Sequence, residues 1–281
     1  MSVYYQDDLV TLLLGDALGQ VSALPDASVD CMVTSPPYFG LRDYGVAGQL
    51  GAEPTIAEYV NNLVDLFREC RRVLTDDGTF WLNLGDTYKS KNLLMVPARV
   101  AIALQDDGWV LRSSVIWHKT NAMPESVQDR PSRRHEHVYM LTKSRRHFFD
   151  LDGIREPHKT VATHAKHAAP RELRARNGET KMGAGVSHSM GFSKGGKNPG
   201  DVWAFGTARF RGAHFAPFPE EIPRRAILAG CHPGGTVLDP FSGSATTGMV
   251  ALDLGRKYIG VDINREYHDL ALTTRLARNA A

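Results

Sequence analysis

The stretch TVLDPFSGSATTGMVALDLGRKYIGVDIN, from Thr236 to Asn264, determines the predicted fold. It begins with a short apolar run that indicates a buried strand, and the small residues that follow predict a tight loop. The stretch continues with the pattern of a helix and then of a second apolar strand. Doubly wound α/β sheets bind nucleotide-like ligands with this unit of strand, small-residue loop and helix. We therefore expect an α/β sheet with a ligand beside the loop.

The loop DPFSGSATTG, from Asp239 to Gly248, indicates which kind of ligand binds there. It matches neither the dinucleotide-binding pattern G-x-G-x-x-G nor the P-loop, whose lysine it lacks. Asp239 would repel a phosphate, so it suits a cationic ligand. Asp262 follows 23 residues later, at the predicted end of the next strand, where a carboxylate can bind the two hydroxyls of a ribose. A ribose with a positive charge and no phosphate describes S-adenosylmethionine, although the loop alone also fits an ordinary tight turn.

The rest of the chain also alternates between the patterns of strands and helices. Alternation of this kind predicts parallel βαβ units and an open α/β sheet. The predicted strands are Leu9–Asp16, Val29–Ser35, Thr79–Asp86, Trp109–Lys119 and His135–Ser144, and the predicted helices are Ile56–Leu74, Val96–Asp106 and Phe218–Cys231.

A basic segment from Arg155 to Gly200 interrupts this alternation. It contains nine Lys and Arg residues against three Asp and Glu, in a chain whose net charge is +2. A structureless stretch of this length in a compact domain is usually functional or mobile. Its composition alone also fits a solvated insertion without a role.

A second motif, SPPY, follows the predicted strand that ends at Ser35. A pair of prolines ends a strand abruptly and holds the backbone rigid. The exocyclic amine of adenine or cytosine is a poor nucleophile, and two acceptors at its N–H groups would free its lone pair. The Ser35 side chain and the Pro36 carbonyl can be those acceptors, held by Pro37, while Tyr38 stacks on an extruded base. A lone SPPY is more often a strand-ending turn, but its place beside the predicted cofactor loop favours the catalytic interpretation.

The composition excludes several other classes of protein. No apolar run approaches the roughly 20 residues that span a bilayer, and the N-terminus lacks the pattern of a secretory signal. The three cysteines are scattered, which indicates a reducing cytoplasm and neither a disulfide framework nor a metal site. We therefore expect a cytoplasmic protein without a metal.

Taken together, the motifs resemble the permuted β group of amino-methylating DNA methyltransferases. In that group the catalytic (D/S)PP(Y/F/W) motif comes first, a target-recognition region follows, and the cofactor loop comes last. TSPPY from Thr34, LDPFSGSATT from Leu238 and HFAPFPEEI from His214 resemble its motifs, and GDALGQVSALPDASVD from Gly15 resembles its opening segment. WHKTNAMPESVQDRPSRRHEHVYMLTK, from Trp117, resembles a segment of phage and solitary members.

The resemblance implies a permuted Rossmann-like, S-adenosylmethionine-dependent sheet with a catalytic half over residues 1–154, a target-recognition insertion over 155–200 and a cofactor-binding half over 201–281. The implied catalytic residues are Ser35, Pro36, Pro37 and Tyr38. The implied cofactor-binding residues are Asp16, Thr34, His214, Phe218, Pro219, Asp239, Pro240, Phe241, Ser242, Gly243, Ser244, Thr246, Thr247 and Asp262.

The target base stays open between adenine and cytosine. Ser35 stands where adenine enzymes typically carry Asp, which favours N4 of cytosine, whereas the match to solitary members favours N6 of adenine, and we expect adenine by a small margin. Ala245 also departs from the group, which usually has Gly there.

Two alternative functions are those of an inactive DNA-binding protein and of an amide-methylating protein methyltransferase. The latter typically begins its catalytic motif with Asn and places its cofactor loop first.

The expected partner is double-stranded DNA. The predicted contacts to DNA are the basic residues Arg130, Arg133, Arg134, Lys166, Arg174, Arg176, Lys181, Lys194 and Lys197. Phosphate contacts of this kind supply affinity, and a few polar side chains read the base edges. The resemblance further implies a homodimer, and nothing in the sequence indicates whether a restriction endonuclease accompanies the protein.

Overall fold

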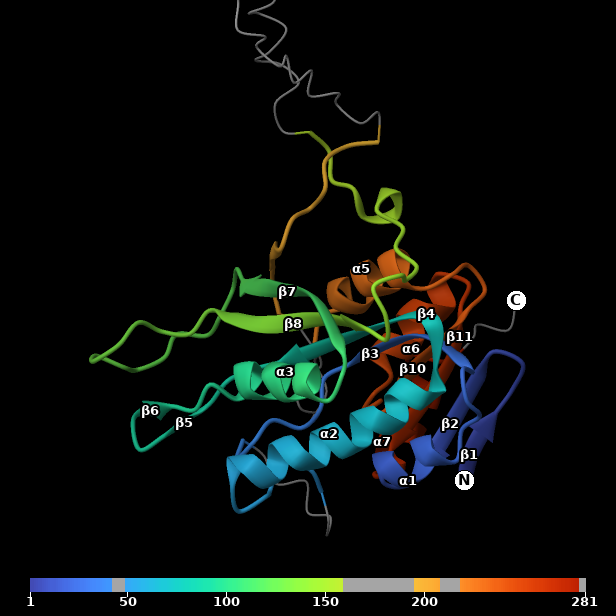
Figure 1. Ribbon diagram of the computed structural model, residues 1–281, viewed down its shortest axis with the longest axis horizontal. Helices are drawn as coiled ribbons and strands as arrows, with labels where there is room; N and C mark the ends of the chain where they lie inside the picture. The colour runs from blue at the N-terminus through green and yellow to red at the C-terminus, as the bar shows by residue number, and fades with distance from the viewer. Residues whose placement is uncertain (42–48, 159–194, 208–217, 278–281) are drawn as a thin grey trace, which may run out of the picture.

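The computed structural model describes residues 1–41, 49–158, 195–207 and 218–277. Its centre is a nine-stranded sheet with helices on both faces, so that the molecule has three layers (Figure 1). In spatial order the strands are β1 (Val3–Gln6), β2 (Val10–Leu14), β11 (Lys257–Asp262), β10 (Thr236–Asp239), β3 (Val29–Thr34), β4 (Leu74–Leu84), β8 (His135–Thr142), β7 (Val110–Lys119) and β9 (Val202–Phe205).

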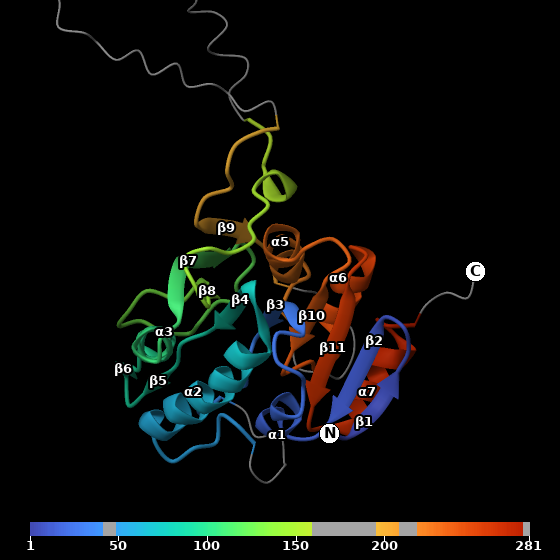
Figure 2. The same cartoon turned by 45° about the vertical axis from the view of Figure 1, so that its right-hand side comes forward.

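The five strands from β2 to β4 run parallel, and β8 then pairs antiparallel with both β4 and β7. The late strands β10 and β11 lie between the early strands β2 and β3, so both ends of the chain build one sheet (Figure 2). The predicted α/β class with a mostly parallel sheet is confirmed. Within the described ranges, no helix is long and apolar enough to cross a membrane.

Side chains of the central strands alternate between two hydrophobic cores, as the pleat of a strand requires. Met32 and Phe80 face the first core, and helices α1 (Ala17–Ser22), α2 (Ile56–Val73) and α3 (Val96–Asp106) cover it. Cys31 and Trp81 face the second core, and helices α5 (Glu221–Gly230), α6 (Thr246–Asp253) and α7 (Arg265–Thr273) cover it. The amphipathic helices thus bury their apolar faces on opposite sides of the sheet.

All the predicted strands and helices are present, with shifted ends. The largest shift is in β4, which begins directly after α2 at Leu74 rather than at Thr79. The elements that the patterns did not predict are β1, β9, α1, α7 and the small hairpin of β5 (Tyr88–Lys89) and β6 (Asn92–Leu93). Most of these are too short for a hydrophobic period to develop.

The loop after β10 has an unusual backbone at Ala245. This residue has a φ of 59°, in the left-handed region, and it is fully buried at the start of α6. Glycine adopts this conformation without steric cost, whereas a residue with a Cβ is strained there. The turn itself therefore explains why the methyltransferases that this chain resembles usually carry Gly at the position.

A buried carboxylate, Asp239, ties the end of β10 to its neighbours. Its Oδ1 accepts hydrogen bonds from Thr34 Oγ1 at 2.6 Å and from the Phe241 amide at 3.0 Å. Its Oδ2 accepts a hydrogen bond from Thr247 Oγ1 at 2.8 Å. Burial raises the pKa of Asp239 to about 6, against the opposing effect of the two hydroxyl bonds. The carboxylate therefore joins the ends of β10 and β3 and the first turn of α6.

The raised pKa of Asp239 predicts a pH dependence of stability. Its contribution favours the folded state below the unfolded pKa of 3.8 and is lost as the pH rises through about 6. Asp239→Asn removes this titration. The free energy of unfolding of the variant should therefore rise relative to that of the parent protein, by up to about 3 kcal/mol between about pH 4 and pH 7.

Urea denaturation of both proteins without ligand, repeated across this pH range, measures the difference. Asp8→Asn, which removes an exposed carboxylate, is the matched control. A difference between parent and Asp239→Asn that stays constant with pH would contradict the prediction.

Candidate active site

Two cavities meet at the carboxyl ends of β3 and β10, the sheet edge at which α/β proteins bind their ligands. Their volumes are about 320 and about 520 Å³. Ser35 and Pro37 after β3, Phe241 and Gly243 after β10, and Tyr267 on α7 line both cavities. Small-molecule sites typically span roughly 300–1,000 Å³, so each cavity suits one ligand and the two ligands would touch beside Ser35.

The smaller cavity contains two carboxylates. Asp262, at the end of β11, accepts hydrogen bonds from the amides of Gly243 and Asn264, both at 2.8 Å. Burial raises the pKa of Asp262, and these backbone donors partly offset the effect. Asp16 also lines the cavity, and it caps α1 by accepting a hydrogen bond from the Gly19 amide at 2.8 Å.

The chemistry of the smaller cavity fits S-adenosylmethionine. Two carboxylates suit a ligand with hydroxyl groups and a positive charge. Phe241, Leu50 and Ile263 add apolar surface to the walls, as an adenine ring requires. Among the described residues that line the cavity, none is a lysine or an arginine, so no cationic side chain there would attract a phosphate.

The predicted cofactor-binding residues fall into four groups within the described structure. Asp16, Pro240 and Asp262 line the smaller cavity, Phe218, Ser242, Ser244 and Thr246 line the larger one, and Phe241 and Gly243 line both. Thr34, Pro219, Asp239 and Thr247 are buried behind these cavities and line neither. Asp239 in particular bonds to protein groups, so the geometry gives it a supporting place in the sheet. His214 lies outside the described residues.

All four residues of the SPPY motif line the larger cavity. Tyr59 on α2 donates a hydrogen bond to the Pro37 carbonyl at 2.8 Å, which holds the backbone of the motif in place. The Tyr38 ring lies against Gly85, where an added Cβ would come within 2.6 Å of the ring atom Cε2. Glycine at that position therefore leaves room for the tyrosine to turn toward the end of β8.

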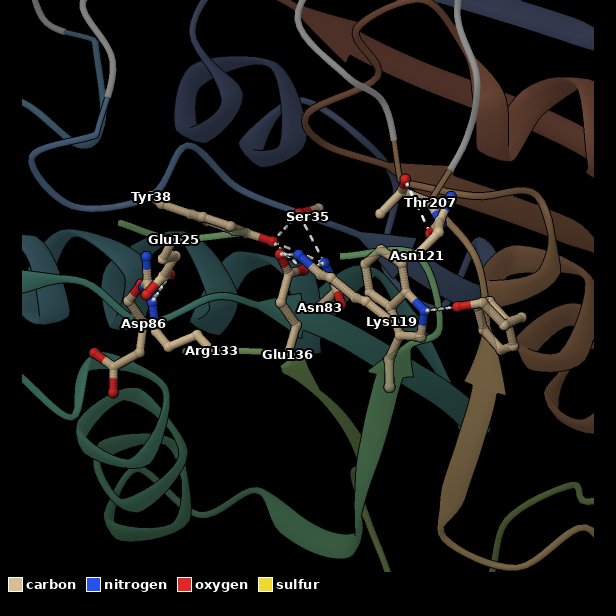
Figure 3. A network of polar contacts seen from close by, with 12 residues as sticks. Ser35, Tyr38, Asn83, Asp86, Lys119, Asn121, Glu125, Arg133, Glu136 and Thr207 are labelled. Carbon is tan, nitrogen blue, oxygen red and sulfur yellow. Dashed lines mark hydrogen bonds and ion pairs between the residues drawn. The ribbon is translucent and has the colours of Figure 1, made fainter. Parts of the chain in front are cut away.

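A polar network joins the SPPY motif to β4, β7 and β8 (Figure 3). Tyr38 Oη lies 2.8 Å from Glu136 Oε2 and 3.2 Å from Ser35 Oγ. Asn83 Nδ2 lies 2.8 Å from Tyr38 Oη, 2.9 Å from Glu136 Oε2 and 3.3 Å from Ser35 Oγ. Lys119 forms an ion pair with Glu136 Oε1. Burial, and then the charge of Glu136, raise the pKa of Tyr38 well above its usual range, so its hydroxyl stays protonated.

Asn83, Lys119 and Glu136 were not among the site residues that the sequence predicted. One feature of the sequence could have indicated Glu136, because it is the only acid in the mostly apolar and aromatic run HEHVYMLT. A half-buried acid of this kind needs a charged or hydrogen-bonding partner. The sequence, however, does not indicate that its partners come from β4, β7 and the loop after β3.

Two arginines predicted to contact DNA are bound within the loop between β7 and β8. Arg130 Nη1 lies 2.7 Å from Glu125 Oε2, and its guanidinium lies 4.0 Å from the centre of the Tyr88 ring. Arg133 Nε lies 3.2 Å from Glu125 Oε1, and its guanidinium also donates to the Asp86 carbonyl. These contacts hold the wall of the larger cavity, and contact with DNA stays a prediction for both residues.

The remaining predicted DNA contacts are placed only in part. Lys197 Nζ lies 3.4 Å from Glu156 Oε2, and Arg134 is exposed and directly precedes β8. Lys166, Arg174, Arg176, Lys181 and Lys194 lie outside the described residues.

Comparison with known proteins agrees with this site. The profile of the DNA methylase family N6_N4_Mtase matches residues 29–273. The Type II methyltransferase M.SmaI of Serratia marcescens is 40% identical, over 95% of this chain and 91% of its own length.

Two solved structures show the same fold. The PvuII DNA methyltransferase, described as cytosine-N4-specific, has a TM-score of 0.73 at 20% identity and covers all of this chain and 90% of its own. A putative DNA modification methylase of Thermus thermophilus, solved with S-adenosyl-L-methionine, has a TM-score of 0.61 at 23% identity and covers 93% of this chain and 91% of its own. The chain therefore belongs to the family of N6-adenine and N4-cytosine DNA methyltransferases, which use S-adenosylmethionine as methyl donor.

Proposed function

We propose that this protein transfers a methyl group to N4 of a cytosine that has been extruded from double-stranded DNA. The observation that carries the proposal is the meeting of the two cavities at Ser35. One cavity suits the methyl donor and the other suits a base, so the reacting groups would face each other beside the SPPY motif. Ser35 in place of Asp, together with the PvuII enzyme described as cytosine-N4-specific, supports cytosine over adenine.

The protein groups of the smaller cavity would hold the donor. Asp262 would bind the ribose hydroxyls, and Phe241 would pack against the adenine ring. When bound, S-adenosylmethionine supplies an electrophilic methyl group on its sulfonium. Asp16 adds a second negative charge to this cavity, and the two carboxylates would favour the cationic methyl donor over the neutral product that remains after methyl transfer.

The SPPY motif would activate the target amine. The lone pair of this amine is delocalised into the ring, so the nitrogen attacks only when its N–H groups are drawn away. Ser35 Oγ and the Pro36 carbonyl would accept these two N–H groups. Preorganised acceptors of this kind act without reorganisation cost at the moment of reaction. Tyr38 lines the same cavity and offers a ring face to the base, where stacking is worth about 1–3 kcal/mol.

Several finer properties belong to the same proposal. The SPPY motif after β3 precedes the cofactor loop after β10 in the chain, which supports the permuted β-group order. The Type II relatives support a role in a restriction-modification system rather than the phage-like or solitary role expected from the Trp117 segment. A homodimer, a cytoplasmic location, the division at residues 155 and 200, and target recognition by the basic insertion remain predictions.

The target base can be identified directly. Purified protein is incubated with S-adenosylmethionine and unmodified, PCR-amplified bacterial DNA, and the nucleosides are then analysed by mass spectrometry. We expect N4-methylcytosine. N6-methyladenine would overturn the choice of base alone, whereas no methylated base at saturating protein would overturn the proposed function.

Ser35→Ala removes one of the two proposed acceptors. We expect the single-turnover rate of methyl transfer to fall about 100-fold or more, the scale typical for loss of one preorganised hydrogen-bond partner in a transition state. Cofactor affinity, measured by calorimetry, should change little, because the substitution removes one atom from the cavity wall and leaves both carboxylates in place. A parent-like rate in this variant would exclude Ser35 from catalysis.

Asp262→Ala tests the cofactor cavity. Removing the carboxylate deletes the proposed contact with the ribose, so the dissociation constant for S-adenosylmethionine should rise at least about tenfold, or roughly 1.4 kcal/mol. Glu266→Ala, an exposed acid on the neighbouring α7, is the control and should bind as the parent does. Equal affinities in Asp262→Ala and the parent would remove Asp262 from the site.

A further inference from the structure

The direction of the Ser35 hydroxyl decides whether this serine can serve as an acceptor, and its importance rests on the proposed function. An ionised aspartate can only accept hydrogen bonds, whereas a serine hydroxyl both donates and accepts. If the Ser35 proton pointed at the target amine, it would compete for the nitrogen lone pair that must attack the methyl group. A serine therefore works as an acceptor at this position only if its proton is held elsewhere.

The polar network determines where that proton points. Glu136 is an ionised carboxylate paired with Lys119, so it accepts hydrogen bonds and donates none. The Asn83 atom that lies 2.9 Å from Glu136 Oε2 must then be its amide nitrogen, and the Tyr38 hydroxyl at 2.8 Å must donate to the same oxygen. With its own proton committed, Tyr38 Oη can only accept from Ser35 at 3.2 Å.

We propose that Glu136 is a positioning residue that acts through the Tyr38 hydroxyl to turn the Ser35 proton away from the target amine. Ser35 donates to Tyr38, and Tyr38 donates to Glu136, so the hydrogen bonds run in one direction. Figure 3 draws both contacts as dashed lines. The Ser35 oxygen consequently presents a lone pair to the larger cavity, as the aspartate of related enzymes does without assistance.

Lys119 has a part in the same arrangement. Its ammonium group pairs with Oε1 of Glu136 and leaves Oε2 to Tyr38 and Asn83. The Glu136 side chain is only 13% exposed, and a carboxylate this buried needs an opposite charge. The ion pair with Lys119 thus holds Glu136 in the conformation in which it orients the tyrosine hydroxyl.

Glu136→Gln tests the direction of these hydrogen bonds with almost no change in the shape of the side chain. The glutamine carbonyl oxygen should stay with the Lys119 ammonium, so its amino group would face Tyr38 and donate to it. The Tyr38 proton would then point at Ser35, and the Ser35 proton at the amine. We expect the single-turnover rate, at saturating DNA and cofactor, to fall about 10- to 100-fold.

Tyr38→Phe breaks the same relay while it keeps the ring. Its rate should fall by a similar factor, and the double variant Tyr38→Phe/Glu136→Gln should be no slower than the slower single variant. Residues that act through one another are non-additive in this way. A merely structural Glu136 would instead multiply its effect with that of Tyr38→Phe.

Lys119→Met provides a rescue. Without the ammonium group, the glutamine introduced by Glu136→Gln would be free to turn its oxygen toward Tyr38. The rate reduction caused by Glu136→Gln should therefore be at least about threefold smaller in the Lys119→Met background than in the parent protein. Cofactor affinity should be the same in all variants, because none of these three side chains lines the smaller cavity. Circular dichroism and melting temperatures verify that each variant folds.

The outcomes separate the two claims. If the parent protein does not methylate unmodified PCR-amplified DNA, the proposed function fails. If the parent is active but the double variant is slower by the product of the single effects, or Tyr38→Phe keeps the parent rate, the role of Glu136 is overturned. Should Glu136→Gln fail to fold, the rate of Tyr38→Phe alone decides.

Discussion

The site depends on one buried constraint, the carboxylate of Asp239 held between Thr34 and Thr247. Thr34 is the last residue of β3 and directly precedes Ser35, while Asp239 is the last residue of β10 and directly precedes the cofactor loop. Their 2.6 Å hydrogen bond therefore fixes the two functional loops relative to each other. The carboxylate stays out of the cavities and sets the distance between their walls.

The chemistry follows from that placement. The two cavities share walls at Ser35 and Gly243, so a donor and an acceptor base would meet without movement of the sheet. On one side, the loop is held by the buried turn at Ala245 and by the hydrogen bond that the Gly243 amide donates to Asp262. On the other side, Tyr59 holds the SPPY backbone. Reactive groups that are fixed in advance avoid much of the entropic cost of bringing two substrates together.

The sequence predicted the fold and the two loops because local patterns encode them. Apolar runs followed by SPPY or by a Gly/Ser loop indicate strand ends, and β3 and β10 each end within one residue of the expected position. The local patterns do not show which polar side chains are buried against protein groups. Asp239 was expected to face a ligand, but it is buried and accepts hydrogen bonds from the hydroxyls of Thr34 and Thr247. Glu136 was not predicted as a site residue. Its partners lie up to 98 residues away along the chain, and only the antiparallel insertion of β8 beside β4 brings them together.

The most direct test of this account is a crystal structure of the protein with a cognate DNA duplex and sinefungin, an unreactive amine analogue of the methyl donor. We expect sinefungin in the cavity of about 320 Å³ and an extruded base in the cavity of about 520 Å³. The exocyclic nitrogen of the base should lie about 2.6–3.2 Å from Ser35 Oγ, within hydrogen-bond reach. A base bound away from Ser35, or a Tyr38 hydroxyl out of reach of both Ser35 and Glu136, would contradict it.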